Sequence, residues 1–209
     1  MKNLIVICLV IFAMVACAQE TPSNGWISLF DGETLNGWKF SEDAGTFSVQ
    51  DSLIVVHGKR SHLFYVGDGD VSWTNFEFKA DVMTETGANS GIYFHTEFQQ
   101  DGWPAKGYEV QVNNSHSDWR RTGSLYNIVD VKESQAKDNE WFTEHIIVKG
   151  KQIIVNVNGV QVIDYTEPED VNYDGMPGRR ISSGTFCLQG HDPKSVVYFK
   201  NIMVRPLPE

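Results

Sequence analysis

The fold is decided by a run of alternating residues, Phe76-Glu77-Phe78-Lys79-Ala80-Asp81-Val82. Every second residue is apolar, so in an extended chain one face is buried and the other meets water. Similar alternation is found along much of the chain between Gly, Asn and Asp residues, whereas the 3.6-residue period of an amphipathic helix is hard to find. The pattern predicts an all-β protein.

The turns between these segments have the composition of tight hairpins. Three residue pairs each separate two strand-like segments: Asp51-Ser52, Gly150-Lys151 and Asn158-Gly159. Asn-Gly favours the positive φ angles of a type I′ turn, which joins two antiparallel strands directly. Strands at this spacing, without an internal repeat or low-complexity linker, predict a two-sheet antiparallel jelly-roll sandwich. The segments 101–106 and 167–180 contain Gly, Pro and charged residues, and we expect them to form loops over one end or face of the sandwich.

Composition limits the class of protein and its partners. The chain has 209 residues, of which 41% are hydrophobic and 12% aromatic, so a single domain with its own apolar core is expected. Its formal net charge is −10, and the sequence contains no basic run. A phosphate backbone repels an acidic chain of this kind, and we therefore expect no nucleic-acid partner.

The N-terminus has the features of a bacterial secretory signal. A positively charged start precedes an unbroken run of apolar and small residues, 4–16, which is too short to span a hydrocarbon core of about 30 Å. The run ends at Met14-Val15-Ala16-Cys17, which is similar to the lipoprotein box, in which the cysteine is lipidated and becomes the first residue. We therefore expect residues 1–16 to be a lipoprotein signal peptide, with ordinary cleavage after Ala16 or Ala18 as the alternative.

The expected processing accounts for two of the three cysteines. Cys8 is removed with the signal and Cys17 is lipidated, which leaves Cys187 without a disulfide partner. Cys187 stands in an alternating segment with no basic neighbour to lower its pKa, so a buried structural thiol is expected rather than a nucleophile. Residues 17–25 would be a short linker, and 26–209 the folded domain of a periplasmic or outer-membrane lipoprotein that contacts the membrane only through its lipid.

Two strand-like segments, 89–95 and 107–113, carry the most distinctive polar residues. Side chains at alternate positions share a face, so these strands, if they are neighbours, would collect one polar set. This set contains Tyr93, His95, Glu109, Gln111 and Asn113. The hydroxyl groups of a sugar need paired donors and acceptors, and its C–H faces stack on aromatic rings, so such a surface suits a carbohydrate. The alternative is an ordinary solvated sheet face.

Four histidines are candidate ligands of a divalent metal: His95, His116, His145 and His191. The sequence has no HExxH motif and no closely spaced His/Cys cluster, so the metal requirement stays open. His145 is expected to point to solvent from a strand, whereas His191 stands at a turn that can project a side chain over a sheet end. The segment 116–121 joins Trp119 to two arginines, and would either clamp a ligand or stabilise a loop by ion pairing.

In addition, a series of segments along the chain resembles a large bacterial family, the 3-keto-disaccharide hydrolase domain. The segments are Trp26–Lys39, Asn89–Ile92, Gly107–Gln111, Gly123–Tyr126, Glu140-Trp141, Asn158-Gly159, Leu188–His191 and Phe199–Ile202. The resemblance covers residues 26–207, essentially the whole domain. At His95 this chain departs from the family, which often has Arg there, and a charge role at this position is left unassigned.

The resemblance implies a concanavalin A-like, laminin G-like jelly roll with a concave sugar-binding face. It also implies action on glycosides or disaccharides whose C3 hydroxyl has been oxidised to a ketone. A C3 carbonyl acidifies the C2 proton and places the C1 glycosidic oxygen β to itself, so a base can expel the C1 substituent and water can then add to the enone. Such an enzyme needs a base near C2, an electrophile or hydrogen-bond donor at the C3 oxygen and an acid at the leaving group.

On this basis Glu109 or His191 is expected to serve as base or acid. The expected sugar contacts are Asn89, Tyr93, His95, Gln111, Asn113, Trp119, Arg120 and Tyr126. Arg120 would stabilise the enolate charge, and a divalent metal with His and Glu ligands is the alternative electrophile. No other cofactor is expected.

Two other functions fit the same sequence. A sandwich of this type also serves lectin-like modules, so a non-catalytic carbohydrate-binding surface lipoprotein is the main alternative. The third is a surface protein that binds another polypeptide through residues 101–121, for which an exposed apolar patch without a pocket would be the sign.

Overall fold

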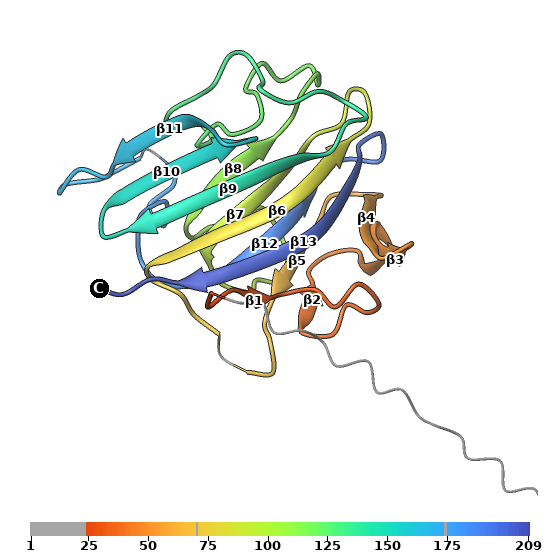
Figure 1. Ribbon diagram of the computed structural model, residues 1–209, viewed down its shortest axis with the longest axis horizontal. Coiled ribbons are helices and arrows are strands. Elements are labelled where there is room, and N and C mark those ends of the chain that lie inside the picture. Colours follow the sequence, from red (N-terminus) through yellow and green to blue (C-terminus); the bar gives the residue numbers. More distant parts are fainter. Residues whose placement is uncertain (1–23, 70, 174) are drawn as a thin grey trace, which may run out of the picture.

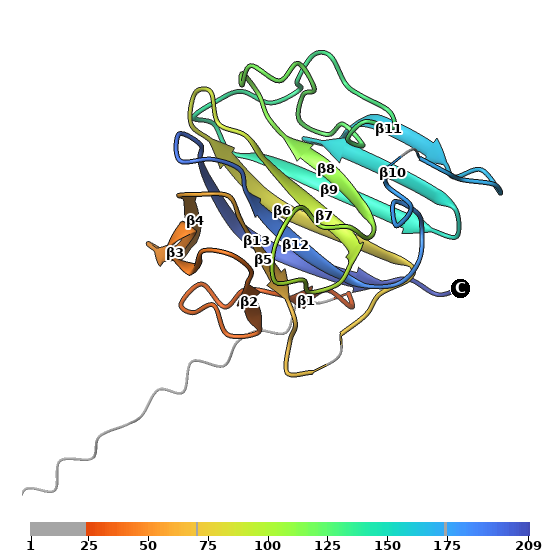
Figure 2. The same cartoon turned by 180° about the vertical axis from the view of Figure 1, so that it is seen from behind.

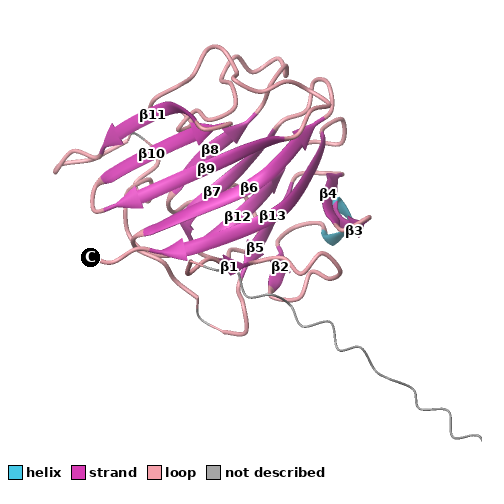
Figure 3. Ribbon diagram, in the orientation of Figure 1, coloured by secondary structure: helices cyan, strands magenta, loops and turns pink. Residues whose placement is uncertain are grey.

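The computed structural model describes residues 24–69, 71–173 and 175–209. Across these ranges the chain is strand and loop, with a single 3₁₀ turn at Ala44–Thr46 (Figure 3). This confirms the all-β prediction. The described ranges include no helix that is long and apolar enough to cross a membrane. The expected signal peptide, Cys17 and residues 17–23 of the expected linker lie outside the described residues.

Two antiparallel sheets form the sandwich. The larger sheet runs in the order β11 (Val160–Thr166), β10 (Gln152–Val157), β9 (Phe142–Lys149), β6 (Phe76–Thr84), β13 (Val196–Pro206), β4 (Leu53–His57) and β3 (Phe47–Gln50), with β1 (Ile27–Ser28) also paired to β13. The smaller sheet runs in the order β2 (Trp38–Phe40), β5 (Ser61–Tyr65), β12 (Thr185–Gly190), β7 (Ser90–Thr96) and β8 (Tyr108–Val112). Figures 1 and 2 show the two sheets as stacked layers, as the jelly-roll prediction requires.

The three predicted turns each connect two consecutive antiparallel strands. β3 with β4, β9 with β10, and β10 with β11 are antiparallel neighbours, and each register leaves the predicted residue pair as the turn. Asn158 and Gly159 have φ angles of 52° and 77°, as a type I′ turn requires. Short turns of this kind keep consecutive strands side by side in the larger sheet.

The core lies between the two sheets. β6 alternates between buried and partly buried residues, with Phe76, Phe78, Ala80 and Val82 on the buried face. From the smaller sheet, Phe186 packs against Phe78 with their ring centroids 4.6 Å apart. Burial of each such ring contributes roughly 1.5–3 kcal/mol, so this apolar layer is the main source of attraction between the sheets.

The smaller sheet differs from the larger one because both of its faces are covered. Every residue of β7, β8 and β12 is buried, although the sequences of these strands alternate in polarity. Their apolar side chains, such as Ile92 and Val110, belong to the inter-sheet core, so the alternate side chains face outward from the sandwich. Three long connections, 97–107, 113–141 and 167–184, contain no named strand, which agrees with the two predicted loop segments. This covered outer face holds the site.

Cys187 lies on the same outer face. It is a buried, free thiol in contact with Phe64 and Tyr93. Burial raises the pKa of the thiol well above its ordinary value, and the neighbouring charge of Glu109 adds to this effect. A thiol that resists ionisation is a poor nucleophile, which confirms the expected structural role.

Candidate active site

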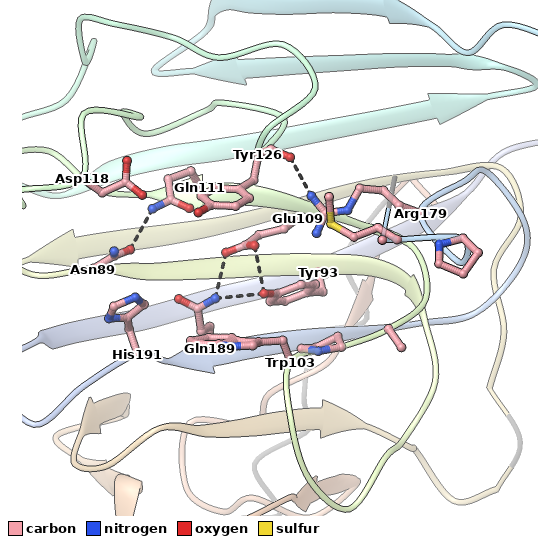
Figure 4. A pocket seen from close by; sticks show the side chains of 15 residues that line it. Asn89, Tyr93, Trp103, Glu109, Gln111, Asp118, Tyr126, Arg179, Gln189 and His191 are labelled. Carbon is pink, nitrogen blue, oxygen red and sulfur yellow. Dashed lines mark hydrogen bonds between the residues drawn. The ribbon is translucent and has the colours of Figure 1, made fainter. Parts of the chain in front are cut away.

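A pocket of about 460 Å³ opens on the outer face of the smaller sheet (Figure 4). Side chains from β7, β8 and β12 form its floor, and residues from the three long connections form its walls. The lining residues are Asn89, Tyr93, Trp103, Pro104, Ala105, Glu109, Gln111, Asp118, Tyr126, Gly175, Met176, Pro177, Arg179, Gln189 and His191. A volume of this order is typical of small-molecule sites.

Glu109 occupies the middle of the pocket floor (Figure 4). It lies on β8 directly opposite Tyr93 of β7, whose hydroxyl donates to Glu109 Oε2 at 2.9 Å. Gln189, on the adjacent β12, donates from Nε2 to Glu109 Oε1 at 2.8 Å and to the Tyr93 hydroxyl oxygen at 3.0 Å. Three strands therefore orient one carboxyl group through both of its oxygens.

The surroundings of Glu109 change its affinity for a proton. Burial raises the pKa of this carboxyl, which is 5% exposed. The hydrogen bond from Tyr93, the charge of Arg179 and the hydrogen bond from Gln189 favour the ionised form and offset part of that rise. A carboxyl with a raised pKa on the floor of a pocket is suited to general acid–base chemistry.

Gly91 creates the space that Glu109 fills. In the β7–β8 register Gly91 lies opposite Gln111, one position along the same face from the Tyr93–Glu109 pair. A Cβ atom at residue 91 would stand only 2.4 Å from Glu109 Oε1. A side chain of any size at this position would therefore force the carboxyl group to move.

Polar side chains stand at both ends of the pocket (Figure 4). At one end, Gln111 donates from Nε2 to Asn89 Oδ1 at 2.7 Å. At the other end, Arg179 donates from Nη1 to the backbone carbonyl of Tyr126 at 2.7 Å, which holds its guanidinium group in the wall. The pocket thus combines hydrogen-bonding amides at one end with a positive charge at the other.

His191 follows β12 and lies between two other rings. Its ring centroid is 5.6 Å from that of Trp103 and 5.6 Å from that of His116. Its Nδ1 atom is 2.8 Å from Asp192 Oδ2. Trp103 is 45% exposed and presents a flat aromatic face of the kind that stacks on sugar rings.

Comparison with known proteins agrees with this fold. Residues 25–205 match the family described as the 3-keto-alpha-glucoside-1,2-lyase-like domain. The chain belongs to this family. A relative from Bacteroides thetaiotaomicron named 3-keto-disaccharide hydrolase is 28% identical, over 88% of this chain and 79% of its own length.

Solved structures extend the comparison of this lyase-like domain. A Parabacteroides distasonis protein described as a candidate glycosyl hydrolase is 25% identical with a TM-score of 0.75, over 88% of this chain and 94% of its own. A carbohydrate-binding module from Bacillus subtilis is 12% identical with a TM-score of 0.52, over 87% of this chain and 95% of its own. The second likeness concerns the fold alone.

Six of the site residues predicted for the lyase-like domain line the pocket: Asn89, Tyr93, Glu109, Gln111, Tyr126 and His191. The period-2 pattern placed Tyr93, Glu109 and Gln111 on one face, and the β7–β8 register brings them together as expected. The polar face is buried under loops, so it is not the ordinary solvated face that was the alternative.

The prediction that His95 shares this face is wrong. His95 has a φ angle of 55°, which interrupts the alternation of β7. Its ring packs at right angles on the core ring of Phe76, and its Nε2 atom is 2.9 Å from the Thr74 carbonyl. Burial lowers its pKa to about 4, so this histidine is a neutral structural residue outside the pocket.

Asn113, Trp119 and Arg120 also lie outside the pocket lining. Asn113 is fully buried and organises the following loop by donating to the backbone carbonyls of Asp118 and Arg120. Arg120 pairs with Asp130 at 3.2 Å, and its guanidinium carbon lies 4.8 Å from the ring centroid of Tyr126. Arg120 therefore supports the pocket wall from behind, and Trp119 is an exposed residue beside it.

Nine of the fifteen lining residues were not among the predicted site residues, and two of these, Gln189 and Arg179, act on Glu109. Gln189 is two residues after Cys187, so the period-2 pattern could have placed its side chain on the outer face. That it contacts Glu109 is known only from the order of the strands, in which β12 pairs with β7 and β7 pairs with β8. Arg179 lies in a Gly- and Pro-containing loop without periodicity, and its position depends on how that loop folds back. The structure thus puts Arg179 in the pocket, where the sequence analysis expected Arg120.

Within the described ranges, His116, His191 and Asp192 could offer metal-ligand atoms within 4.8 Å of one another. In this cluster the Asp118 amide donates to His116 Nδ1, and Asp192 Oδ2 accepts from Ser195 and lies 2.8 Å from His191 Nδ1. A histidine that contacts a carboxylate through one ring nitrogen is also the arrangement found in metal sites, where the other ring nitrogen binds the metal. The cluster therefore keeps a divalent metal as the alternative electrophile. His145 is partly exposed on β9 and pairs with Glu77 at 3.0 Å.

Proposed function

We propose that this domain cleaves glycosides or disaccharides that carry a ketone at C3. Membership of the lyase-like family and the relative named 3-keto-disaccharide hydrolase support this substrate class. The observation that carries the proposal is Glu109, a buried carboxyl with a raised pKa whose two oxygens are oriented by Tyr93 and Gln189 on the floor of a sugar-sized pocket.

The proposed reaction is an elimination followed by addition of water. A base removes the C2 proton, and the electron pair of that bond forms the C2–C3 double bond while the C3 oxygen becomes an enolate. The enolate then expels the C1 substituent, whose oxygen takes a proton from an acid. Finally water adds to C1 of the enone and a proton returns to C2, so that the net reaction is hydrolysis.

The pocket contains groups suited to each of these steps. Glu109 and His191 are suited to proton transfer, and the Arg179 guanidinium is suited to the negative charge that develops on the C3 oxygen. Asn89 and Gln111 offer amide groups for the sugar hydroxyls. Trp103 offers a ring for a C–H face of the sugar.

A carbohydrate-binding role without catalysis is less well supported. A module that only binds sugar needs a stacking surface with hydrogen-bonding groups and has no use for a buried acid with a raised pKa. The polypeptide-binding alternative expected an apolar patch without a pocket in residues 101–121, whereas Trp103 and Asp118 from that segment line the pocket.

The test compares an aryl glucoside with its 3-keto counterpart. We expect the purified domain to release the aryl alcohol from the keto substrate only. In deuterated water the 3-keto-glucose product should carry deuterium at C2 beyond the amount exchanged without enzyme, because the C2 proton is removed and replaced. Saturable binding of both sugars with cleavage of neither would favour the binding module instead.

We also propose that the protein is exported and anchored through lipid on Cys17, on the basis of the sequence from Met14 to Cys17. Cells labelled with a radioactive fatty acid should incorporate label into the wild-type protein and not into the Cys17→Ala variant. Equal labelling of both proteins, or of neither, would contradict this proposal.

A further inference from the structure

The hydrogen bonds around His191 have fixed directions. A backbone amide can only donate, so the bond from the Asn89 amide to Ser195 Oγ at 2.9 Å makes the Ser195 oxygen an acceptor there. The Ser195 hydroxyl proton is therefore directed to Asp192 Oδ2, at 2.8 Å. The Lys194 amide donates to the other oxygen, Asp192 Oδ1, also at 2.8 Å.

Asp192 is consequently an ionised acceptor. The Lys194 amide donates to Oδ1 and the Ser195 hydroxyl donates to Oδ2, and both bonds favour the ionised form. An ionised carboxylate has no proton to donate, so the 2.8 Å contact with His191 places a proton on His191 Nδ1. Neutral His191 then carries its free lone pair on Nε2.

The neighbouring His116 is held in the opposite form. The Asp118 amide donates to His116 Nδ1 at 3.0 Å, and the Asn89 side-chain amide lies 3.3 Å from the same atom. Because Nδ1 is an acceptor, the proton of neutral His116 is on Nε2. Two imidazoles with centroids 5.6 Å apart therefore differ in tautomer, and only His191 offers a free ring nitrogen.

We propose that Asp192 is a positioning residue that fixes the tautomer of His191, so that His191 Nε2 is the base that removes the C2 proton. Glu109, on the pocket floor with both oxygens oriented by Tyr93 and Gln189, is then the acid that protonates the leaving oxygen. In the second half of the reaction the Glu109 carboxylate takes a proton from the water that adds to C1, and His191 delivers a proton to C2, so both groups return to their starting forms. This assignment rests on the proposed function, and it resolves which of the two groups is base and which is acid.

The titratable groups on which the charge of His191 would act lie in four segments of the chain. They are His62 on β5, Glu109 on β8, His116 in the connection after β8, and Asp192 directly after His191. Of these, Asp192 alone is within hydrogen-bonding distance of a His191 ring nitrogen. It is therefore the group whose replacement should change the tautomer.

The first test reads the tautomers directly by ¹H–¹⁵N NMR of ring-labelled protein at a pH where the histidines are neutral. His191→Gln and His116→Gln variants assign the signals. We expect wild-type His191 to be protonated on Nδ1 and His116 on Nε2. A His191 protonated on Nε2 would overturn the proposal. This readout needs no turnover. If the protein shows the predicted tautomers but does not cleave keto-glucosides, the result counts against the proposed function and not against the hydrogen-bond assignment.

The second test uses turnover of the keto-glucoside. Asp192→Asn keeps the shape of the side chain but offers His191 an amide, so we expect Nε2-protonated His191 to appear and kcat to fall about 100-fold. Ser195→Ala is the matched control, because it removes one bond to Asp192 and leaves the carboxylate in place; we expect a loss below about tenfold. Equal losses of kcat in the two variants would mean that Asp192 only supports the loop, and this would overturn the proposal. Loss of activity with a chelator, restored by a divalent cation that shifts both histidine signals, would also overturn the proposal.

Discussion

Glu109 and Glu144 are both buried carboxyl groups, but they lie on different faces of the sandwich. Glu109 is 5% exposed and Glu144 is fully buried, and burial is the largest cause of the raised pKa of each. Glu109 lies on the outer face of the smaller sheet, whereas Glu144 lies on β9 of the larger sheet, opposite Ala80 of β6 and facing the core. Neither carboxyl oxygen of Glu144 has a hydrogen-bond partner, and the nearby Gly123 amide offsets the effect of burial only in part.

The difference shows that a raised pKa alone does not make a catalytic group. Glu144 faces the core, has no side-chain donor on its oxygens and is not among the residues that line the active-site pocket, so we infer that it is a protonated acid enclosed by the core. Glu109 has donors on both oxygens and faces a space that a ligand can enter. Orientation and access, added to burial, are what distinguish the candidate catalytic acid.

Among the changes that retain the Glu109 carboxyl, the largest effect is expected from Gly91→Ala, which breaks its orientation. The new Cβ would stand 2.4 Å from Glu109 Oε1, so the carboxyl must rotate away from Tyr93 and Gln189. A displacement of this order can reduce kcat about 100-fold. Gly69→Ala is the control, since its Cβ would meet no atom within 4 Å. Wild-type kcat in the Gly91 variant would show that the exact placement of Glu109 is unimportant.

A smaller effect is expected from Tyr93→Phe, which removes one donor from Glu109 and keeps the ring. The hydrogen bond from Tyr93 lowers the pKa of Glu109, so its loss raises that pKa further. The limb of the kcat/KM pH profile that reports Glu109 should move to higher pH, with a loss of about tenfold at the optimum, equivalent to about 1.4 kcal/mol. If the pH profile of the variant does not move, Glu109 is not the group whose titration limits kcat/KM.

The smallest effect on activity, and a clear one on stability, is expected from Glu144→Gln. Because its folded-state pKa is raised, wild-type Glu144 stabilises the fold fully below the ordinary Glu pKa and progressively less as pH rises through the folded-state value. The amide does not titrate, so the free energy of unfolding of the variant, measured in urea, should rise relative to that of wild type as pH rises above the ordinary Glu pKa. Parallel pH profiles for the two proteins would contradict a protonated Glu144.

The strands and part of the pocket floor could be predicted because they depend on local patterns. Alternation identified β6, and period 2 placed Tyr93, Glu109 and Gln111 on one face. The prediction failed at His95, where a φ angle of 55° interrupts the alternation of the strand. It also missed Arg179, because a loop without periodicity gives no sign of where it folds back onto the sheet.

The most direct measurement replaces each of the two buried acids by its isosteric amide and follows release of the aglycone from a 3-keto-glucoside. With Glu109 as the pocket acid, Glu109→Gln should lose about 1,000-fold in kcat while keeping the wild-type unfolding curve, and Glu144→Gln should turn over at the wild-type rate. Near-normal turnover by Glu109→Gln, or an equal loss in both variants, would contradict the assignment of Glu109 to catalysis.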